Sequence, residues 1–153
     1  MPTIELLKKG FLFQNCSQEE LDLLAQIVSE RQIAAKQSVF AEGSQATAMF
    51  IIQHGTVEIL KGELKDEKDS RVIVAELQAG THFGEMAFVD RAPRAAEAVA
   101  KQDLKLLEIK FDDLERVVAG RPTLGLKLYH AMATTLCQRI RRTTADLSHI
   151  LLH

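Results

Sequence analysis

The segment HFGEMAFVDRAPRAAEAVA, residues 82–100, decides how the rest of the sequence is interpreted. It places Gly84 beside the acid Glu85, and nine residues after the acid it places Arg94 among small residues. An arginine donates two parallel hydrogen bonds to anionic oxygens and stays charged at any relevant pH. A carboxylate only accepts hydrogen bonds and suits a sugar hydroxyl. The segment fits a site for a sugar and a phosphate, but a turn with a surface Glu85–Arg94 ion pair, worth under about 1 kcal/mol, explains the same residues.

Length and composition predict one globular domain over residues 1–153. Apolar residues make up 46% and charged residues 26% of the chain, which excludes a disordered protein. The formal net charge of −2 argues against a general nucleic-acid or membrane binder, since both need a basic surface. The sequence has no signal peptide and no apolar run near the ~18 residues of a membrane span. Cys16 and Cys137 lack metal-ligand spacing, so we predict free thiols in a cytoplasmic protein without a metal or other cofactor.

Hydrophobic patterning divides the chain into three zones. Residues 3–31 are predicted to be helical, and Ser17 with Glu20 forms the capping box of a helix start. Residues 32–110 contain short β-rich runs separated by glycines, which is typical of a sandwich or barrel. Residues 111–153 are helical again, and Asp112 with Glu115 fits a second capping box. The pattern predicts an α+β fold with a β-barrel or sandwich between two helical zones.

The last predicted helix runs from about Leu124 to Leu152, after an interruption by Gly120, Pro122 and Gly125. Apolar residues recur every three or four positions along this helix and form one stripe, which is about 40 Å long at ~1.5 Å per residue. A small domain rarely covers a stripe of this length by itself. We predict that the helix pairs with that of a second copy to form a homodimer; the alternative is that it folds back on its own barrel. The stripe consists of Leu124, Leu128, Met132, Leu136, Ile140, Thr143, Leu147 and Ile150.

With its flanks, the opening segment resembles the phosphate-binding cassette of cyclic nucleotide-binding domains. The stretch LQAGTHFGEMAFVDRAPRAAEAVA, residues 77–100, carries that family's Gly, its Phe-Gly-Glu, a short helix and Arg-Ala-Ala after a proline, at the family's Glu-to-Arg spacing. At this point it is more similar to protein-kinase regulatory subunits than to bacterial Crp/Fnr-like transcription factors. Residues 12–60 resemble the family's N-terminal helices and first strands. The resemblance implies an eight-stranded β jelly-roll barrel, followed by a hinge and a long C-terminal helix.

The resemblance also implies residue roles. Arg94 would bind the cyclic phosphate, and Glu85 would accept a hydrogen bond from the ribose 2′-hydroxyl. The position after the arginine can assist guanine when it is Thr or Ser, so Ala95 favours cyclic AMP over cyclic GMP. Phe83 and Phe88 are expected to pack in the core rather than to bind. The remaining ligand-binding residues of the cassette would be Gly84, Met86, Ala87, Ala95 and Ala96.

In the family, a residue of the C-terminal helix often covers the purine. Arg139, Ile140 and Arg142 fall in about the right region, and Arg139 stacked on adenine would form a cation–π contact. A solvated basic face is the alternative reading of the same residues. Gly120 and Gly125 would form the hinge through which the last helix closes over the pocket when the ligand draws the cassette inward.

The resulting hypothesis is a non-enzymatic sensor of a cyclic nucleotide, cyclic AMP or else cyclic GMP. No helix-turn-helix follows the long helix before His153, so we expect no direct DNA binding and an output through an unidentified protein partner. One alternative is a scaffold of the same fold that binds no nucleotide. Another is a cupin-like metal enzyme, for which His82, Glu85 and His54 have suitable side chains but lack the His-x-His pair.

Overall fold

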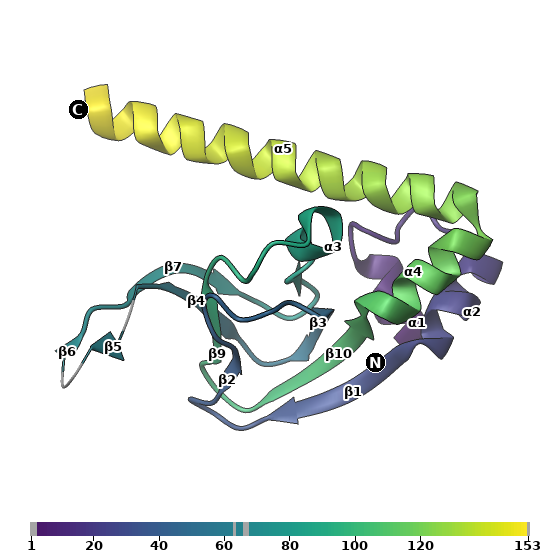
Figure 1. Cartoon of the computed structure of the whole chain (residues 1–153), viewed down its shortest axis with the longest axis horizontal. Helices are drawn as coiled ribbons and strands as arrows, with labels where there is room; N and C mark the ends of the chain where they lie inside the picture. The colour runs from purple at the N-terminus through teal and green to yellow at the C-terminus, as the bar shows by residue number, and fades with distance from the viewer. Residues whose placement is uncertain (1–2, 63, 66–67, 153) are drawn as a thin grey trace.

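The computed structural model describes residues 3–62, 64–65 and 68–152. Short helices precede a β-roll, a one-turn helix interrupts it, and two helices follow it (Figure 1). The helices are α1 (Thr3–Lys9), α2 (Gln18–Gln26), α3 (Met86–Asp90), α4 (Phe111–Gly120) and α5 (Pro122–Leu152). The strands are β1 (Val28–Ile33), β2 (Ser38–Phe40), β3 (Ala48–His54), β4 (Val57–Lys61), β5 (Leu64–Lys65), β6 (Lys68–Asp69), β7 (Val72–Leu77), β8 (His82–Phe83), β9 (Glu97–Ala100) and β10 (Leu104–Lys110).

Two antiparallel four-stranded sheets form the roll, in the orders β1-β10-β3-β8 and β2-β9-β4-β7. Most neighbours within each sheet are distant in sequence, as in a jelly roll; Val28 opposes Ile109, for example, and Val57 opposes Ala100. The predicted eight-stranded jelly roll is therefore confirmed. The pair β5-β6 is an additional hairpin that extends β4 and β7 away from the roll (Figure 1).

The buried residues of strand β3 divide between two hydrophobic clusters. Because side chains alternate along a strand, β3 directs Phe50 and Ile52 between the sheets and Met49 and Ile51 towards the helices. Both faces of β3 are covered, which explains why five consecutive residues of this strand are buried. The helix-side cluster joins α1, α2, α4 and the first half of α5 to the sheet that carries β8 and the start of the cassette.

The N-terminal helical zone is shorter than predicted. Helix α2 ends at Gln26, and Val28–Ile33 is strand β1, so the predicted helical range 3–31 is wrong in its last residues. Pairing with β10 overrides the weak helical periodicity there. The capping box at Ser17 and Glu20 is confirmed, since the Ser17 Oγ accepts from the Glu20 amide and Glu20 Oε1 accepts from the Ser17 amide.

The second predicted capping box is wrong. Helix α4 begins at Phe111, directly after β10, with Lys110 at the N-cap and no side-chain cap there. Phe111 is buried and its amide donates to the Thr47 carbonyl, so tertiary packing fixes the helix start before Asp112. Asp112 and Asp113 therefore lie in the first turn of α4, where their negative charges interact favourably with the positive end of the helix dipole.

Gly125 is not part of a break between helices. The chain turns at Arg121, Pro122 opens α5, and Gly125 lies inside that helix. A Cβ at Gly125 would meet Val118 Cγ1 at 2.6 Å, so this glycine allows close packing of α4 and α5. Of the two predicted hinge glycines, Gly120 does lie at the junction, as the last residue of α4.

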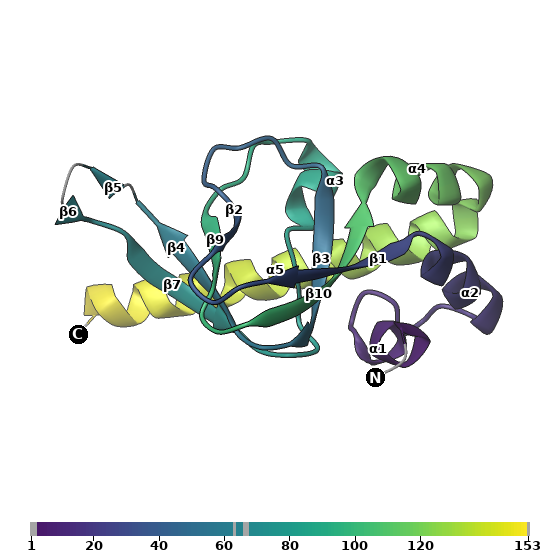
Figure 2. The ribbon, with the colours of Figure 1, turned by 90° about the horizontal axis from the view of Figure 1, so that it is seen from below.

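Helix α5 runs along the whole molecule and passes over α3 (Figures 1 and 2). In its first half Leu124, Leu128 and Met132 are buried in the helix-side cluster. From 137 to 149 every residue is exposed, including Ile140 and Leu147 of the predicted stripe. The first half of the stripe thus packs on its own domain, and the prediction that the second half pairs with another copy stays a prediction.

The capping box of α2 also fastens that helix to α5. Glu20 is only 5% exposed, and its Oε1 accepts from both the Ser17 amide and Lys127 Nζ, the latter at 2.6 Å. Burial alone raises the pKa of Glu20, but the hydrogen bonds from Lys127 and Ser17 offset this effect and lower the pKa below its ordinary value. One carboxylate therefore joins the N-terminal helices to the start of the long helix.

We expect Glu20→Ala to destabilise the fold more than Ser17→Ala. Loss of the Ser17 cap costs about 1 kcal/mol of unfolding free energy, whereas loss of Glu20 removes its cap bond and its bond with Lys127 together, about 1–3 kcal/mol. Urea denaturation followed by circular dichroism at one fixed protein concentration measures both. Glu19→Ala, which removes a surface pair with Arg121, is the control and should change stability least. Equal losses for Ser17→Ala and Glu20→Ala would show that the Lys127 contact contributes nothing.

Candidate functional site

The cassette is built around a turn that only glycine adopts easily. Gly84 has a φ of +80° and lies between strand β8 and helix α3. Helix α3 ends at Asp90, and the next residue, Arg91, caps it with a left-handed φ of 59°. The chain then runs through Pro93 and Arg94 to strand β9. The turn and the short helix bring Glu85 and Arg94 back to the same end of the roll.

The side chain of Arg94 is held by two backbone carbonyls and an aromatic ring, and the residue is only 7% exposed. Its Nη1 donates to the Gly84 carbonyl at 2.7 Å and its Nη2 donates to the Ala48 carbonyl. The guanidinium carbon lies 4.1 Å from the ring centroid of Phe40, a close cation–π contact. Burial lowers the pKa of Arg94, with Glu85 acting in the opposite direction, and an arginine remains charged across the physiological range.

The backbone of Arg94 is held as firmly as its side chain. Its amide donates to the Ser44 carbonyl at 2.9 Å, and its carbonyl accepts from the Gly43 amide at 2.8 Å. Gly43 has a φ of +80°, so the turn between β2 and β3 supports the arginine loop. A cation with a fixed backbone and a stacked guanidinium binds an anion with little loss of conformational entropy.

Glu85 is the most buried charged residue of the site, with 2% exposed surface. His82 Nε2 lies 3.5 Å and Arg139 Nη1 lies 3.0 Å from its Oε1. Burial raises the pKa of Glu85, but His82 and Arg139 more than offset this effect, so the pKa lies below its ordinary value and the carboxylate is ionised at neutral pH. The 3.5 Å separation from His82 is an electrostatic contact rather than a well-formed hydrogen bond.

Buried polar atoms without a hydrogen-bond partner gather in this site. Among the residues that the structure describes, such atoms are His82 Nε2, both carboxylate oxygens of Glu85, and Arg94 Nε. An unsatisfied buried polar atom costs about 1–3 kcal/mol, so proteins retain few of them without a reason. Acceptors on one side and a donor on the other match a ligand that offers a hydroxyl and an anion.

The structure places the other predicted residues in three different settings. Met86 is 44% exposed at the start of α3, Ala95 is exposed and Ala96 half-buried. Ala87 is buried in the helix-side cluster, so its side chain packs rather than faces outward. Phe83 and Phe88 are core residues, as predicted.

Of the candidate purine-covering residues, the structure brings Arg139 to Glu85. Ile140 is 64% exposed and Arg142 is also exposed, on the uncovered part of α5. Sequence reasoning missed Phe40, which stacks under Arg94, and it considered His82 only as a metal ligand. A sequence pattern contains no signal for Phe40, because this contact depends on the way β2 folds beside the cassette.

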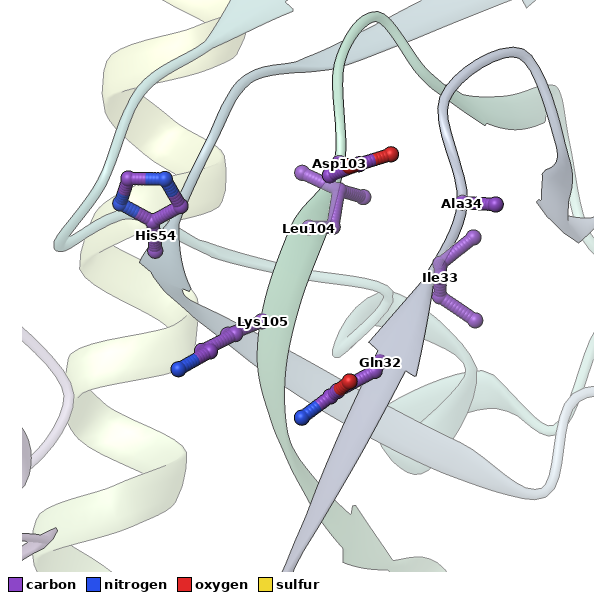
Figure 3. A pocket seen from close by; sticks show the side chains of 7 residues that line it. All are labelled: Gln32, Ile33, Ala34, His54, Asp103, Leu104 and Lys105. Atoms are coloured by element: carbon purple, nitrogen blue, oxygen red, sulfur yellow. The ribbon is translucent and has the colours of Figure 1, made fainter.

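A hollow lies on the roll away from the cassette. It has a volume of about 560 Å³ and lies where β1, β3 and β10 present Gln32, His54 and Lys105, with Asp103 at its edge (Figure 3). These polar side chains are exposed. Their exposure makes this hollow a weaker candidate than the cassette, because polar groups that water already satisfies gain little from a ligand.

The metal-enzyme alternative gains no support from the arrangement of ligating side chains. His82 and Glu85 are neighbours, but His54 lines the hollow of Figure 3. Within the described part of the chain, no three His, Cys, Asp or Glu side chains are grouped so that they could hold a metal ion. Across the same residues, no helix has the length and apolar character that a membrane crossing requires.

Comparison with known proteins identifies a family. Residues 30–121 match the model of the cyclic nucleotide-binding domain. The cyclic AMP receptor protein of Thermus thermophilus is 27% identical over 141 residues, 92% of this chain. A crystal structure of a cyclic nucleotide-binding domain from Methylobacillus flagellatus has a TM-score of 0.78 and 25% identity, covering 94% of this chain and 79% of that one. The regulatory domain of Toxoplasma gondii PKA, crystallised with cAMP, has a TM-score of 0.67 and 26% identity over 75% of this chain and 42% of that one.

The curated relatives are longer proteins. The chain spans 62% of the Thermus receptor and smaller shares, 32% and 19%, of two others. The match therefore concerns a domain that occurs within different larger proteins.

Gly84→Ala should disturb the site through two effects. The alanine would have to adopt a left-handed φ, and its Cβ would lie 2.8 Å from Arg94 Nη1. The guanidinium would then have to move away from the Gly84 carbonyl. We expect a loss of about 1–3 kcal/mol in unfolding free energy. Thermal unfolding followed by circular dichroism measures the loss.

Gly80→Ala is the matched control for that substitution. Gly80 also has a positive φ, +93°, but a Cβ there meets nothing within 4 Å. The difference between the two variants isolates the contact with Arg94 from the backbone strain that both share. Equal losses of stability would contradict the close approach of Gly84 and Arg94.

Proposed function

Because the chain belongs to the cyclic nucleotide-binding domain family, we propose that it binds a cyclic nucleotide, cyclic AMP, at Arg94 and Glu85. The observation that carries the proposal is that two groups occur in one site: an immobilised, charged guanidinium, and a buried carboxylate whose oxygens accept no hydrogen bond among the described residues. A phosphate next to a ribose satisfies both groups at once. The proposal concerns the nucleotide-binding domain alone.

Arg94 provides the charge for the cyclic phosphate. Its stacking on Phe40 and its bonds to two carbonyls orient the guanidinium, so little rotamer freedom is lost on binding. The amides of Met86 and Ala95 lie next to Glu85 and Arg94 in the chain, and Gly84 leaves the backbone open to close approach. Glu85 then accepts from the ribose 2′-hydroxyl, which distinguishes a ribonucleotide from its deoxy form.

The choice of cyclic AMP follows from Ala95. This residue follows the arginine and has no hydroxyl with which to assist guanine. The Thermus receptor, named for cyclic AMP, and the Toxoplasma domain, crystallised with cAMP, support the same ligand.

The signal would pass through α5 to a protein partner. The ring of Phe88 in α3 stacks on Tyr129 in α5 at 5.6 Å, and Arg91 forms an ion pair with Glu115 in α4. Both contacts join the cassette helix to the C-terminal helices. A change in the cassette therefore acts directly on the elements that lead out of the domain.

Isothermal titration calorimetry with cyclic AMP, and then cyclic GMP, tests the proposed ligand. We expect micromolar or tighter binding of cyclic AMP and weaker binding of cyclic GMP. Arg94→Ala should weaken cyclic AMP binding about ten- to hundredfold, which corresponds to the loss of charge-assisted hydrogen bonds. Arg94→Lys keeps the charge but loses the planar guanidinium, so its affinity for cyclic AMP should lie between those of the wild type and Arg94→Ala.

Arg116→Ala removes an exposed arginine of α4 and is the control for a general loss of charge. Arg94 also supports the fold, so thermal unfolding of each variant must show that it is folded before its affinity is compared. A folded Arg94→Ala variant with unchanged affinity would refute the assigned site. An absence of binding by the wild-type domain to either nucleotide would favour the scaffold that binds no nucleotide.

We also propose that the second half of α5 pairs with the same helix of another copy. Ile140 and Leu147 are 64% and 53% exposed along the predicted stripe, and a helix with so much uncovered apolar surface favours self-association. Light scattering should give a dimer for the wild type and a monomer for Leu147→Glu. Leu126→Glu is the control, since Leu126 is 72% exposed but lies off the stripe. A wild-type monomer at high micromolar concentration contradicts the pairing.

A further inference from the structure

The buried acid of the cassette has a histidine as its neighbour. His82 Nε2 lies 3.5 Å from Glu85 Oε1, and the two side chains are 11% and 2% exposed. Neither this nitrogen nor either carboxylate oxygen has a hydrogen-bond partner among the described residues. A ribose hydroxyl donates one hydrogen, so it satisfies one oxygen of Glu85 and leaves His82 Nε2 without a partner. The histidine therefore needs an explanation of its own.

Strand β8 fixes the direction of the imidazole. His82 opposes Ile51 of β3, and the next residue, Phe83, opposes Phe50. Ile51 belongs to the helix-side cluster, whereas Phe50 and Phe83 belong to the cluster between the sheets. Because successive side chains of a strand point to opposite faces, His82 faces the side of the sheet that the helices cover. The fold thus directs the histidine to Glu85, three residues further along the chain.

The charged side chains that face this pair come from two other elements. Arg139 of α5 lies 3.0 Å from the same Glu85 oxygen. Arg94, in the loop before β9, interacts electrostatically with Glu85. Both arginines keep their charge at every physiological pH, and Glu85 is ionised at neutral pH because its pKa lies below the ordinary value. Among these four residues, His82 is the one whose type of side chain changes charge between about pH 5 and pH 8.

A bound nucleotide would shift the protonation of this histidine in one direction. The phosphate of the ligand brings a negative charge into the site, and a nearby negative charge favours the protonated form of an imidazole. Exclusion of water by the ligand strengthens this attraction and that of Glu85 for the imidazolium. His82 is already buried without a ligand, so binding adds little to the desolvation that favours its neutral form. The effects of charge therefore decide, and they favour the uptake of a proton.

We infer that His82 is a positioning residue for Glu85, and that it couples the binding of an anionic ribonucleotide to the uptake of a proton. Protonated His82 donates to Glu85 Oε1 and leaves Oε2 for the ribose hydroxyl. The inference rests on the proposed function and deepens it, because it makes the affinity of the site depend on pH. Since the bound state holds more protons than the free state, affinity rises as the pH falls.

Isothermal titration calorimetry with cyclic AMP tests the coupling. Titrations at about pH 6 and about pH 8 compare the affinities. Titrations at about pH 7 in PIPES and in imidazole, two buffers with different enthalpies of ionisation, measure the number of protons taken up. For the wild type we expect uptake of a fraction of one proton, and about three- to tenfold tighter binding at the lower pH. The phosphodiester and the adenine of the ligand do not titrate in this range, so the change reports on the protein.

His82→Gln separates the charge of the histidine from its contact with Glu85. Glutamine can place an N–H near the position of Nε2 but cannot take up a proton. We expect this variant to bind cyclic AMP within about twofold of the wild type at the higher pH, and to lose both the proton uptake and the tighter binding at the lower pH. His54→Gln is the matched control, because His54 is an exposed histidine in the hollow of Figure 3, and its pH profile should equal that of the wild type.

The buffer dependence of the wild type is a readout that needs no variant, and it still tests the coupling if His82→Gln does not fold. Thermal unfolding followed by circular dichroism shows whether each variant is folded before its affinity is compared.

Three other results overturn the inference. Proton release on binding, or no change in bound protons, would contradict the coupling in the wild type. Proton uptake that persists in His82→Gln would assign the titration to another group. An equal loss of affinity at both pH values in folded His82→Gln, with uptake retained, would leave His82 a packing residue. In these cases the wild type still binds cyclic AMP, and the proposed function stands. Failure of the wild type to bind at either pH would refute the proposed function and the inference together.

Discussion

The structure depends on keeping a buried guanidinium charged without pairing it tightly to an acid. Carbonyls hold Arg94 from behind and an aromatic ring lies against its face, so its orientation is fixed while its charge is only partly balanced. Carbonyl oxygens carry partial charges and do not cancel a full positive charge as a carboxylate does. The contacts that hold Arg94 come from elements far from it in sequence, since β2 supplies Phe40 and β3 supplies the Ala48 carbonyl. The jelly roll is the framework that brings these strands to one end.

Glycine geometry follows from the same constraint. The carbonyl of Gly84 accepts from Arg94 only because the turn at φ +80° points it at the guanidinium, and a Cβ there would collide with Nη1. Gly43 has the matching role on the other side, where its amide binds the Arg94 carbonyl. The two turns therefore have defined tasks in positioning one side chain.

The sequence predicted the order of the cassette residues and the layout of helices, roll and helices, because these depend on local spacing and periodicity. It also predicted the capping box at Ser17, a local motif that the structure retains. Prediction from the sequence failed where contacts between residues distant in the chain determine the secondary structure. Strand β1 has mostly polar side chains and becomes a strand through pairing with β10, and α4 starts at Phe111 because that ring is buried. The contact between Arg139 and Glu85 depends on the path of α5 across the roll, which no local pattern specifies.

The two halves of the candidate site differ in how their charged groups are held. The phosphate half is fixed: the backbone and guanidinium of Arg94 are held by hydrogen bonds that an anion does not need to break. At the ribose half, the buried Glu85 carboxylate lies beside Arg139, a residue of the exposed part of α5. A ligand at Glu85 would therefore contact a group that α5 also contacts. A conformational signal requires that the ligand binds one arrangement of α5 more tightly than another, because equal affinity for both leaves the equilibrium unchanged.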